Sequence, residues 1–522
     1  MSYATFLNFY QTTLGAALSS TATSLTVSST TGLPSSLASG QFIPMTLTPA
    51  SSPGSAYEIV YVTGISGSSL TVTRGEEGTS ALNWNTGDIL YSTNTAETTG
   101  TSMGSPSTDF QTNTLTASGL ITANDGIDAT GNITVSDLVI TSGISTETVI
   151  NVKYYGATGN GTTDDTTAIQ NAINAAVSAG TYTIYFPAGN YLTSSQLTVN
   201  FPNNTNPYHI NIVGDGQEAS NIISNPSASA NCLVVNLYNQ YQSINIENIS
   251  VFSNTSNGDS VNAIDIVQNS TTITNPANSS LSILRNITIR GSNGFTGSNY
   301  FQYGIAIHGA SNFNIVSTDI TMNNNSSTTG IYIEGPSSSY DVPVVFNLIG
   351  VTVNYCQNGL VVGPNTQGVT INSSNFVGNT YGIVVPSTAS GVNQLSIFNS
   401  SFNNNITNIE FNNSVSGGMI IGNIFYIHPS GFGVDTNGSI TFIGSIIGNT
   451  FFATTTPSSQ TAIALSSTGP LQITGNVIQN QTNGISLGST TSLINVQGNS
   501  YQGVGSNVTN SGTNNTVGVA TD

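Results

Sequence analysis

The segment from residue 151 to residue 197 constrains the fold more than any other part of the chain: NVKYYGATGNGTTDDTTAIQNAINAAVSAGTYTIYFPAGNYLTSSQL. After a glycine-rich turn, the side-chain oxygens of Thr163, Asp164 and Asp165 can accept the free amides of a helix start. Apolar residues then recur at three- and four-residue spacing, at Ala168, Ile169, Ala172, Ile173, Ala176 and Val177. Gly180 marks the helix end, and a strand pattern begins at 183. The pattern predicts one amphipathic helix that closes the open end of a stack of strands.

The rest of the chain repeats approximately. Motifs of the type Gly-Ile-x-Ile recur every 22 to 29 residues, apart from one longer gap that can hold two turns, and they begin at Gly304, Gly330, Gly359, Gly382, Asn408, Ala462 and Gly484. A second series keeps nearly the same period, at Asn375, Asn399, Asn423, Asn449, Asn476 and Asn499. Each repeat therefore predicts strand, corner, strand, corner. We expect the amides of the Asn series to hydrogen-bond up and down the stack.

The helix-and-strand pattern of 151–197 resembles the start of the pectate-lyase-like right-handed parallel β-helix, which occurs in phage tailspikes and polysaccharide-degrading enzymes. The resemblance implies an all-β fold, with a β-helix over 149–505, one capping α-helix and a C-terminal tail over 506–522. It does not by itself assign an activity. We interpret Asp164 and Asp165 as a helix cap and not as a catalytic dyad.

Residues 1–100 form a different unit. Short β patterns separated by Gly, Ser and Pro turns predict a small all-β domain, and they cover 24–27, 42–47, 58–62, 70–73 and 88–91. The phrase EIVYVTGISGSSLTVTRGEEGTSALNWNTGD resembles modules at the N-termini of phage tail and tail-fibre proteins. That resemblance implies attachment to virion tail or baseplate proteins. We interpret Arg74, Glu76 and Glu77 as a charged hairpin turn, with a separate site as the alternative.

A thin connector over 101–148 begins with linker composition and continues with short, glycine-interrupted strand patterns. Strands this short cannot bury a hydrophobic core within one chain, but they can bury one between three chains that wind together. The segment also resembles the trimeric necks of phage fibres. We therefore predict a thin β neck and a homotrimer. Disorder is the alternative.

Charge excludes several classes of protein. The chain has a net charge of −19, and its only cations are Arg74, Lys153, Arg285 and Arg290. A nucleic-acid partner is not expected, because phosphate binding needs basic clusters. A surface solvated by hydroxyls and amides suits a rigid extracellular particle that contacts sugars. Sequons such as those at Asn248 and Asn286 are compatible with glycosylation or with chance.

The remaining sequence signals concern compartment. Cys232 and Cys356 are the only cysteines, so a disulfide framework is excluded and two isolated buried thiols are expected. The first residues have no basic region before a continuous apolar core, so no secretory signal is expected, and no segment has the length and hydropathy of a membrane span. These features predict a virion component of the tail that becomes extracellular when the host lyses.

Aligning the repeats predicts a site. Ala306, Tyr332, Val361, Val384 and Glu410 fall on one outward ladder, with Asp265 in the corresponding place of an earlier repeat. The same alignment makes His308 and Glu334 neighbours, and Asp319 lies in the segment between them. We predict Glu334, Asp319 and His308 as catalytic residues. Tyr332, Asp265, Tyr300 and Tyr303 are predicted to contact sugar, because aromatic faces stack on sugar rings. The alternative is that each is an ordinary solvated side chain.

No cofactor or metal is predicted. Hydrolysis of polysaccharides needs two carboxylates about 5–10 Å apart, whereas a lyase needs a base and a cation or metal, and no Lys or Arg follows Arg290. A glycoside hydrolase is therefore favoured over a lyase. The function expected is a homotrimeric tail fibre or tailspike that recognises a host surface glycan. An active depolymerase and a purely structural spike are the alternatives.

Overall fold

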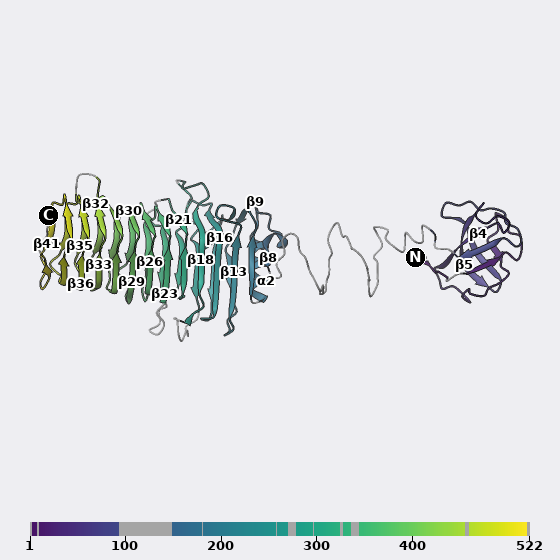
Figure 1. Ribbon diagram of the computed structural model, residues 1–522, viewed down its shortest axis with the longest axis horizontal. Helices are drawn as coiled ribbons and strands as arrows, with labels where there is room; N and C mark the ends of the chain where they lie inside the picture. The colour runs from purple at the N-terminus through teal and green to yellow at the C-terminus, as the bar shows by residue number, and fades with distance from the viewer. Residues whose placement is uncertain are drawn as a thin grey trace. The chain divides into compact units, whose positions relative to one another are not determined.

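The computed structural model describes residues 3–7, 10–92, 95, 149–179, 181–256, 258–269, 278–295, 297–323, 327–335, 344–454 and 459–518. The predicted neck, 101–148, lies outside the described residues. The chain divides into two units, Met1–Asp137 and Leu138–Asp522, which we describe separately (Figure 1).

The first unit contains a sheet whose strands pair in the order β2-β7-β4-β5-β6-β3, with β1 beside β4. The strands are β1 (Tyr3–Ala4), β2 (Gln11–Thr13), β3 (Ser24–Thr26), β4 (Gln41–Thr48), β5 (Glu58–Ser66), β6 (Ser69–Glu76) and β7 (Ile89–Ser92). Alternating residues such as Val60, Val62, Leu70 and Val72 are buried, as period-2 patterning requires. The small all-β domain predicted from the sequence is confirmed.

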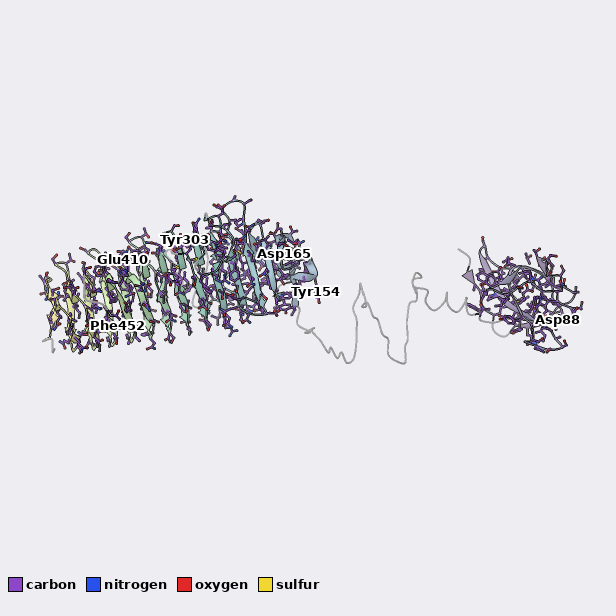
Figure 2. All side chains as sticks on the ribbon, turned by 90° about the horizontal axis from the view of Figure 1, so that it is seen from above. Asp88, Tyr154, Asp165, Tyr303, Glu410 and Phe452 are labelled. Atoms are coloured by element: carbon purple, nitrogen blue, oxygen red, sulfur yellow. The ribbon has the colours of Figure 1, made fainter. Side chains whose placement is uncertain are left out.

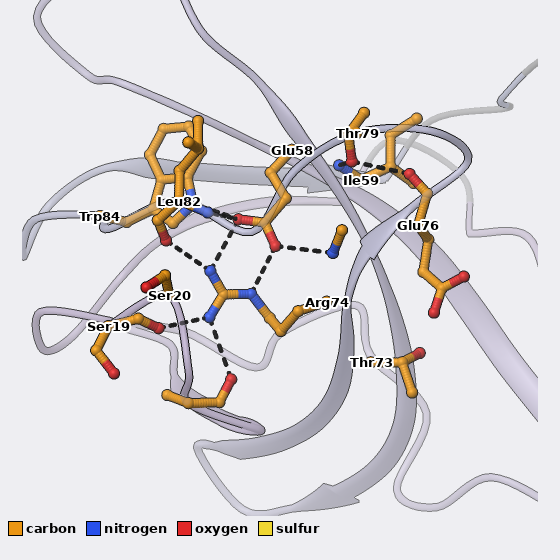
Figure 3. A network of polar contacts seen from close by, with 12 residues as sticks. Ser19, Ser20, Glu58, Ile59, Thr73, Arg74, Glu76, Thr79, Leu82 and Trp84 are labelled. Atoms are coloured by element: carbon orange, nitrogen blue, oxygen red, sulfur yellow. Dashed lines mark hydrogen bonds and ion pairs between the residues drawn. The ribbon is translucent and has the colours of Figure 1, made fainter.

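Arg74 is not part of an exposed hairpin turn, which corrects our interpretation of the sequence. Its guanidinium bonds both carboxylate oxygens of Glu58, at 2.6 and 2.8 Å, and Glu58 is fully buried (Figure 3). The other donors reach the main-chain carbonyls of Ser19, Ala22 and Leu82. Trp84 Nε1 donates to Glu58 at 2.7 Å. A buried ion pair is tolerated when every donor and acceptor is satisfied in this way.

The second unit is a parallel β-helix with three faces, built from strands that stack turn upon turn (Figure 1). We call these the first, second and third faces, in the order in which the chain visits them in each turn. The long strands β16, β18, β30 and β32 bend at a corner and serve two faces each.

The first face comprises β8 (Val149–Asn151), β10 (Thr181–Phe186), β13 (Tyr208–Gly214), the first parts of β16 (Gln242–Ser253) and β18 (Ser282–Gly291), β20 (Phe313–Val316), β23 (Val344–Ile349), β26 (Gln367–Asn372), β29 (Val392–Phe398), β31 (Val415–Ile421), β33 (Phe442–Ile447), β36 (Thr468–Thr474), β39 (Ser492–Gln497) and β42 (Thr516–Val517). The second face comprises β9 (Asn160–Asp164), β11 (Gly189–Thr193), β14 (Ser220–Ser224), the later parts of β16 and β18, β21 (Asp319–Thr321), β24 (Thr352–Asn354), β27 (Asn375–Val377), the first parts of β30 (Ser401–Phe411) and β32 (Ile424–Thr436), β34 (Thr450–Phe452), β37 (Val477–Gln479) and β40 (Ser500–Gln502). The third face comprises β12 (Leu197–Asn200), β15 (Leu233–Leu237), β17 (Asn262–Gln268), β19 (Tyr303–His308), β22 (Thr329–Glu334), β25 (Asn358–Val362), β28 (Tyr381–Val385), the later parts of β30 and β32, β35 (Thr461–Leu465), β38 (Asn483–Leu487) and β41 (Ser506–Asn510).

A 3-10 turn, η1 (Val152–Tyr155), and the helix α2 (Thr166–Ala179) cover the first turns of the stack. The buried residues of α2 are Ile169, Ala172, Ile173 and Ala176, as the spacing predicts. Asp164 and Asp165 both accept main-chain hydrogen bonds, but they stabilise different segments. Asp164 accepts the amide of Thr166 at 3.0 Å, while the buried Asp165 accepts the amides of Thr158 and Gly159 and so fixes the preceding turn.

Side-chain ladders run inside the β-helix. Rings of Phe376, Phe402, Phe425 and Phe451 stack with centroids 5.2, 4.8 and 4.6 Å apart. Asn423, Asn449, Asn476 and Asn499 form the predicted amide ladder. Oδ1 of each of the last three accepts from the backbone amide and the side-chain amide of the preceding Asn, and Asn423 Oδ1 accepts the backbone amide of Ser400.

For two turns, the predicted ladder position is wrong by one residue. Asn375 and Asn399 are exposed, and Ser374 and Ser400 occupy the buried ladder positions instead. Their hydroxyls accept the backbone amides of Val351 and Ser374. The ladder position selects a short polar side chain that accepts from the turn before it, and a serine satisfies this requirement as well as an asparagine.

Candidate functional site

The third face carries the outward ladder predicted from the repeats. Strand register aligns Asp265, Ala306, Tyr332, Val361, Val384 and Glu410 one above another, and Asp435 follows. The register also places His308 directly beside Glu334. In the view of Figure 2, Tyr303 and Glu410 lie along the upper edge of the β-helix, and Phe452 of the second face lies along the opposite edge.

Four residues of the third face form a continuous polar cluster, which we call the histidine cluster: Asp265, His308, Tyr332 and Glu334. His308 Nδ1 lies 2.6 Å from Glu334 Oε1, and His308 Nε2 lies 3.4 Å from Asp265 Oδ1. The Tyr332 hydroxyl donates to Glu334 Oε2 at 2.5 Å. Alternate residues of β22 point outward together, so Tyr332 and Glu334 meet from a single strand.

The cluster holds the His308 imidazole between the carboxyl groups of Asp265 and Glu334. The hydrogen bond to Glu334, together with the charge of Asp265, raises the pKa of His308, although burial opposes this. The His308 hydrogen bond lowers the pKa of Glu334. Burial raises the pKa of Asp265, against the favourable charge of His308. Burial and the bond to Glu334 raise the pKa of Tyr332. Glu334 is thus an ionised acceptor, which does not suit a general acid.

A cavity of about 300 Å³ opens beside the histidine cluster. It is lined by Val261, Asn262, Tyr303, Ala306, His308 and Tyr332, and we call it the third-face pocket. The small side chain of Ala306, at the ladder position between Asp265 and Tyr332, leaves room for it. The Tyr303 and Tyr332 rings meet edge to face, with centroids 6.0 Å apart.

Asn262 supplies a free acceptor at this pocket. Its side chain is 7% exposed, and its Oδ1 has no hydrogen-bond partner among the residues that the structure describes. A buried polar atom without a partner is costly unless a ligand or water satisfies it. Aromatic walls and a few convergent polar groups are the usual composition of a small-molecule site. The arrangement therefore suits a sugar ring stacked on tyrosine, with its hydroxyls bonded to Asn262 and the histidine cluster.

Not all predicted site residues come together. Asp319 lies on β21 of the second face, where it pairs in register with Thr288 and Thr352, so it cannot act with Glu334. The aligned motifs all lie on the third face, so the alignment does not indicate which face is occupied by Asp319, in the segment between two motifs. Tyr300 is 6% exposed, so it offers no face to a sugar. Tyr303 lines the third-face pocket, and its contact with sugar stays a prediction.

Asp435 is a residue that our reading of the sequence missed. It adjoins Glu410 on the outward ladder, and Tyr381 stands nearby on the same face. Burial and the charge of Glu410 raise the pKa of Asp435 to about 6, and burial raises the pKa of Glu410. The charges of both acids raise the pKa of Tyr381, with that of Glu410 contributing most. The longer gap in the Gly-Ile-x-Ile series hides this turn, because Phe432-Gly433-Val434-Asp435 departs from the motif.

Three further observations bear on the class of site. Among the described residues, no group of three or more His, Cys, Asp or Glu side chains is arranged to hold a metal ion. No helix in the described part of the chain is long and apolar enough to cross a membrane. Cys232 and Cys356 are both buried and unpaired with each other.

Comparison with known proteins supports the fold. A family model described as rhamnogalacturonase A/epimerase, pectate lyase-like, matches residues 149–384. The mannuronan C5-epimerase AlgE5 of Azotobacter vinelandii is 59% identical over 44 residues, which are 8% of this chain and only 4% of that protein. Residues 149–384 of the second unit thus resemble the pectate lyase-like family, and the described strands of that unit form a parallel β-helix.

The solved structures that resemble this chain include an epimerase module and a phage tailspike protein. The A-module of mannuronan C-5 epimerase AlgE4 from Azotobacter vinelandii has a TM-score of 0.46 at 17% identity, covering 71% of this chain and all of that module. Tailspike protein 3 of bacteriophage CBA120 has a TM-score of 0.42 at 12% identity, covering 72% of this chain and 62% of that one. Likeness at this level concerns the fold alone.

Proposed function

We propose that this chain binds a polysaccharide through the third-face pocket. The observation that carries the proposal is the pocket itself: two tyrosines, a buried unpaired amide oxygen and a polar cluster converge on about 300 Å³. Binding fits the site better than catalysis by Glu334, because both oxygens of that carboxylate are engaged, by His308 and by Tyr332. A group held in this way positions a ligand and transfers no proton readily.

Charge indicates which sugars bind. Two carboxylates flank one imidazolium in the histidine cluster, so the site carries a net negative charge when His308 is protonated. The four Lys and Arg residues of the chain do not line the third-face pocket, and Arg74, Arg285 and Arg290 pair with Glu58, Glu247 and Glu218. A polymer of uronic acids would be repelled. The ligand expected is a polysaccharide of neutral or amino sugars.

We further propose that the chain serves as a tail fibre or tailspike of a phage virion. The support comes from the sequence: residues 58–88 resemble phage tail modules, and 101–148 resemble a trimeric neck. The first unit would then attach to tail or baseplate proteins, and the β-helix would recognise a host surface glycan. Light scattering tests assembly: the full-length protein is expected to be a trimer whose association weakens when 101–148 is deleted, and a full-length monomer would contradict the proposal.

Binding is tested with a defined panel of neutral trisaccharides of glucose, galactose and N-acetylglucosamine, titrated against the full-length protein by ligand-detected NMR. At least one member is expected to bind, and Tyr303→Ala is expected to weaken that binding about tenfold through lost stacking. Tyr154→Ala, which removes an 84% exposed tyrosine outside the pocket, is the matched control. If no member binds, a purely structural spike becomes the better account.

A second candidate function is cleavage of the bound polymer, and Glu410 with Asp435 favours it. Their strands are adjacent, about 4.8 Å apart, which is close to the carboxyl separation of about 5–5.5 Å in retaining glycosidases. The raised pKa of Asp435, about 6, keeps part of it protonated near neutral pH, as a general acid requires. The test compares how the native protein and two variants shorten a bound polysaccharide. If the native protein and Glu334→Gln shorten it and Asp435→Asn does not, cleavage takes place at Glu410 and Asp435.

A further inference from the structure

A second cavity, of about 450 Å³, lies on the second face. Its lining residues are Gln217, Glu218, Thr288, Phe295, Asp319, Thr321, Asn354 and Tyr355, and we call it the second-face pocket. The strands β18, β21 and β24 supply its floor, with Thr288 beside Asp319 and Thr321 beside Asn354. None of these residues lines the third-face pocket.

Two exposed aromatic rings border the second-face pocket. Phe295 is 57% exposed and Tyr355 is 46% exposed, although aromatic side chains of this size are usually buried. Contiguous exposed apolar surface with a polar rim marks ligand-binding grooves, among other interaction sites. Both rings belong to the lining, so a ligand in the cavity contacts them.

Each ring is held in place by the fold. The Arg290 guanidinium lies over the rings of Phe252 and Phe295, 4.0 and 5.0 Å from their centroids, and it also bonds Glu218. On the other side, Tyr355 packs against Gly378 of the next turn, where an added Cβ would come within 2.8 Å of the ring. The rings are therefore preorganised, which lowers the entropic cost of binding.

The floor of the second-face pocket supplies polar groups. Asp319 is exposed, and in the part of the chain that the structure describes its carboxylate has no hydrogen-bond or ion-pair partner. Asn354 adds an amide whose Nδ2 donates to Thr321 Oγ1 at 3.5 Å, which leaves one N–H and the amide oxygen for a ligand. Glu218 is neutralised by Arg290, so Asp319 is left as the net charge of the pocket. A carboxylate among amides accepts hydrogen bonds from hydroxyls and repels acidic ligands.

We propose that the second-face pocket is a separate binding site for a neutral sugar residue. The sugar ring packs its C–H face on Tyr355 and Phe295, and its hydroxyls donate to Asp319 and exchange hydrogen bonds with Asn354. This inference shares with the proposed function the premise that the chain binds polysaccharide, but it concerns other residues on another face. With two sites on two faces, one β-helix can hold a polymer at two points. The polymer then binds more tightly than at either site alone, because binding at one site raises its effective concentration at the other.

The test uses the full-length protein and the same panel of neutral trisaccharides. Tyr355→Ala and Asp319→Asn are each expected to weaken binding of one panel member about tenfold. Tyr241→Ala is the matched control, since Tyr241 is 48% exposed and lines neither pocket. Unchanged melting temperatures would show that the exposed substitutions leave the fold intact.

The two proposals fail in different ways. Binding that is weakened by Tyr303→Ala and unaffected by Tyr355→Ala and Asp319→Asn overturns the second-face site and keeps the third-face site. The reverse pattern supports the second-face site and overturns the proposed function. An equal loss in Tyr241→Ala, or no binding of any panel member, overturns the second-face site as stated.

Discussion

His308 and Glu334 occupy matched positions on adjacent strands, and the two side chains meet with Nδ1 2.6 Å from Oε1. This pair sets the charge of the third-face pocket, because His308 also faces Asp265 and Glu334 also accepts from Tyr332. The site is an acceptor-rich surface organised around one cation.

The first prediction concerns the protonation of His308. Glu334→Gln is expected to lower the pKa of His308, because the carboxylate whose hydrogen bond raises it is gone. Since the folded pKa lies above the unfolded value, the native pair stabilises the fold fully below about pH 6.5, and this is lost as pH rises through the folded pKa. NMR titration of the three histidines measures it. His428, on the second-face part of β32, is the internal control, and an unchanged His308 would refute the pair.

The second prediction concerns Asp435, whose pKa is raised to about 6. Ionising a carboxyl with a raised folded pKa opposes folding, so its effect on stability grows as pH rises from about 4 to about 6. Asp435→Asn is therefore expected to stabilise the protein by about 1–3 kcal/mol at pH 8. Melting temperatures at a fixed scan rate measure this, with the same variant at pH 4 as the control. Equal effects at both pH values would show that ionisation is not the cause.

The third prediction concerns the amide ladder. Asn449→Ala removes the acceptor of the Asn423 amides and the donor to Ile420, all in a fully buried position. Unsatisfied buried groups should cost about 2–4 kcal/mol. Asn375→Ala makes the same substitution at an exposed position and should change stability by less than about 0.5 kcal/mol. Similar losses in the two variants would remove the ladder as a source of stability.

The fourth prediction concerns the first unit. Arg74→Met leaves the fully buried Glu58 without its cation and should cost about 3–5 kcal/mol. Glu76→Gln, on the same strand, is the control. Trp84 is the only tryptophan in the chain and bonds Glu58, so its fluorescence during denaturant unfolding reports on this unit. An unfolding midpoint that Arg74→Met leaves unchanged would contradict the stabilising role of the pair.

Repeat spacing was sufficient to predict most of the fold. The register of a parallel β-helix is set by one apolar motif per turn, so aligning Gly304 with Gly330 placed His308 beside Glu334 without structural data. The buried face of α2 could be predicted equally well, because apolar residues on one face of a helix recur at three- and four-residue spacing. The ladder residues Ser374 and Ser400 were missed because two residue types satisfy the same hydrogen bonds.

The failures arose where a position depends on corners and loops. Asp319 follows a corner, and the sequence does not show which face the chain enters after it. Tyr300 precedes β19 and is buried by its surroundings, which no local pattern reports. Arg74 lies on a strand of alternating burial, and its partner Glu58 is sixteen residues away, so the ion pair depends on tertiary packing. The second-face pocket combines a loop, three strands and a corner, and no motif joins them.

Titration of the full-length protein with the neutral trisaccharide panel decides whether the third-face pocket binds sugar. At least one trisaccharide is expected to bind, Tyr303→Ala is expected to weaken this binding about tenfold, and Tyr154→Ala is expected to leave it unchanged. If the panel binds equally well to native protein and to Tyr303→Ala, or fails to bind at all, the third-face pocket is not a polysaccharide site.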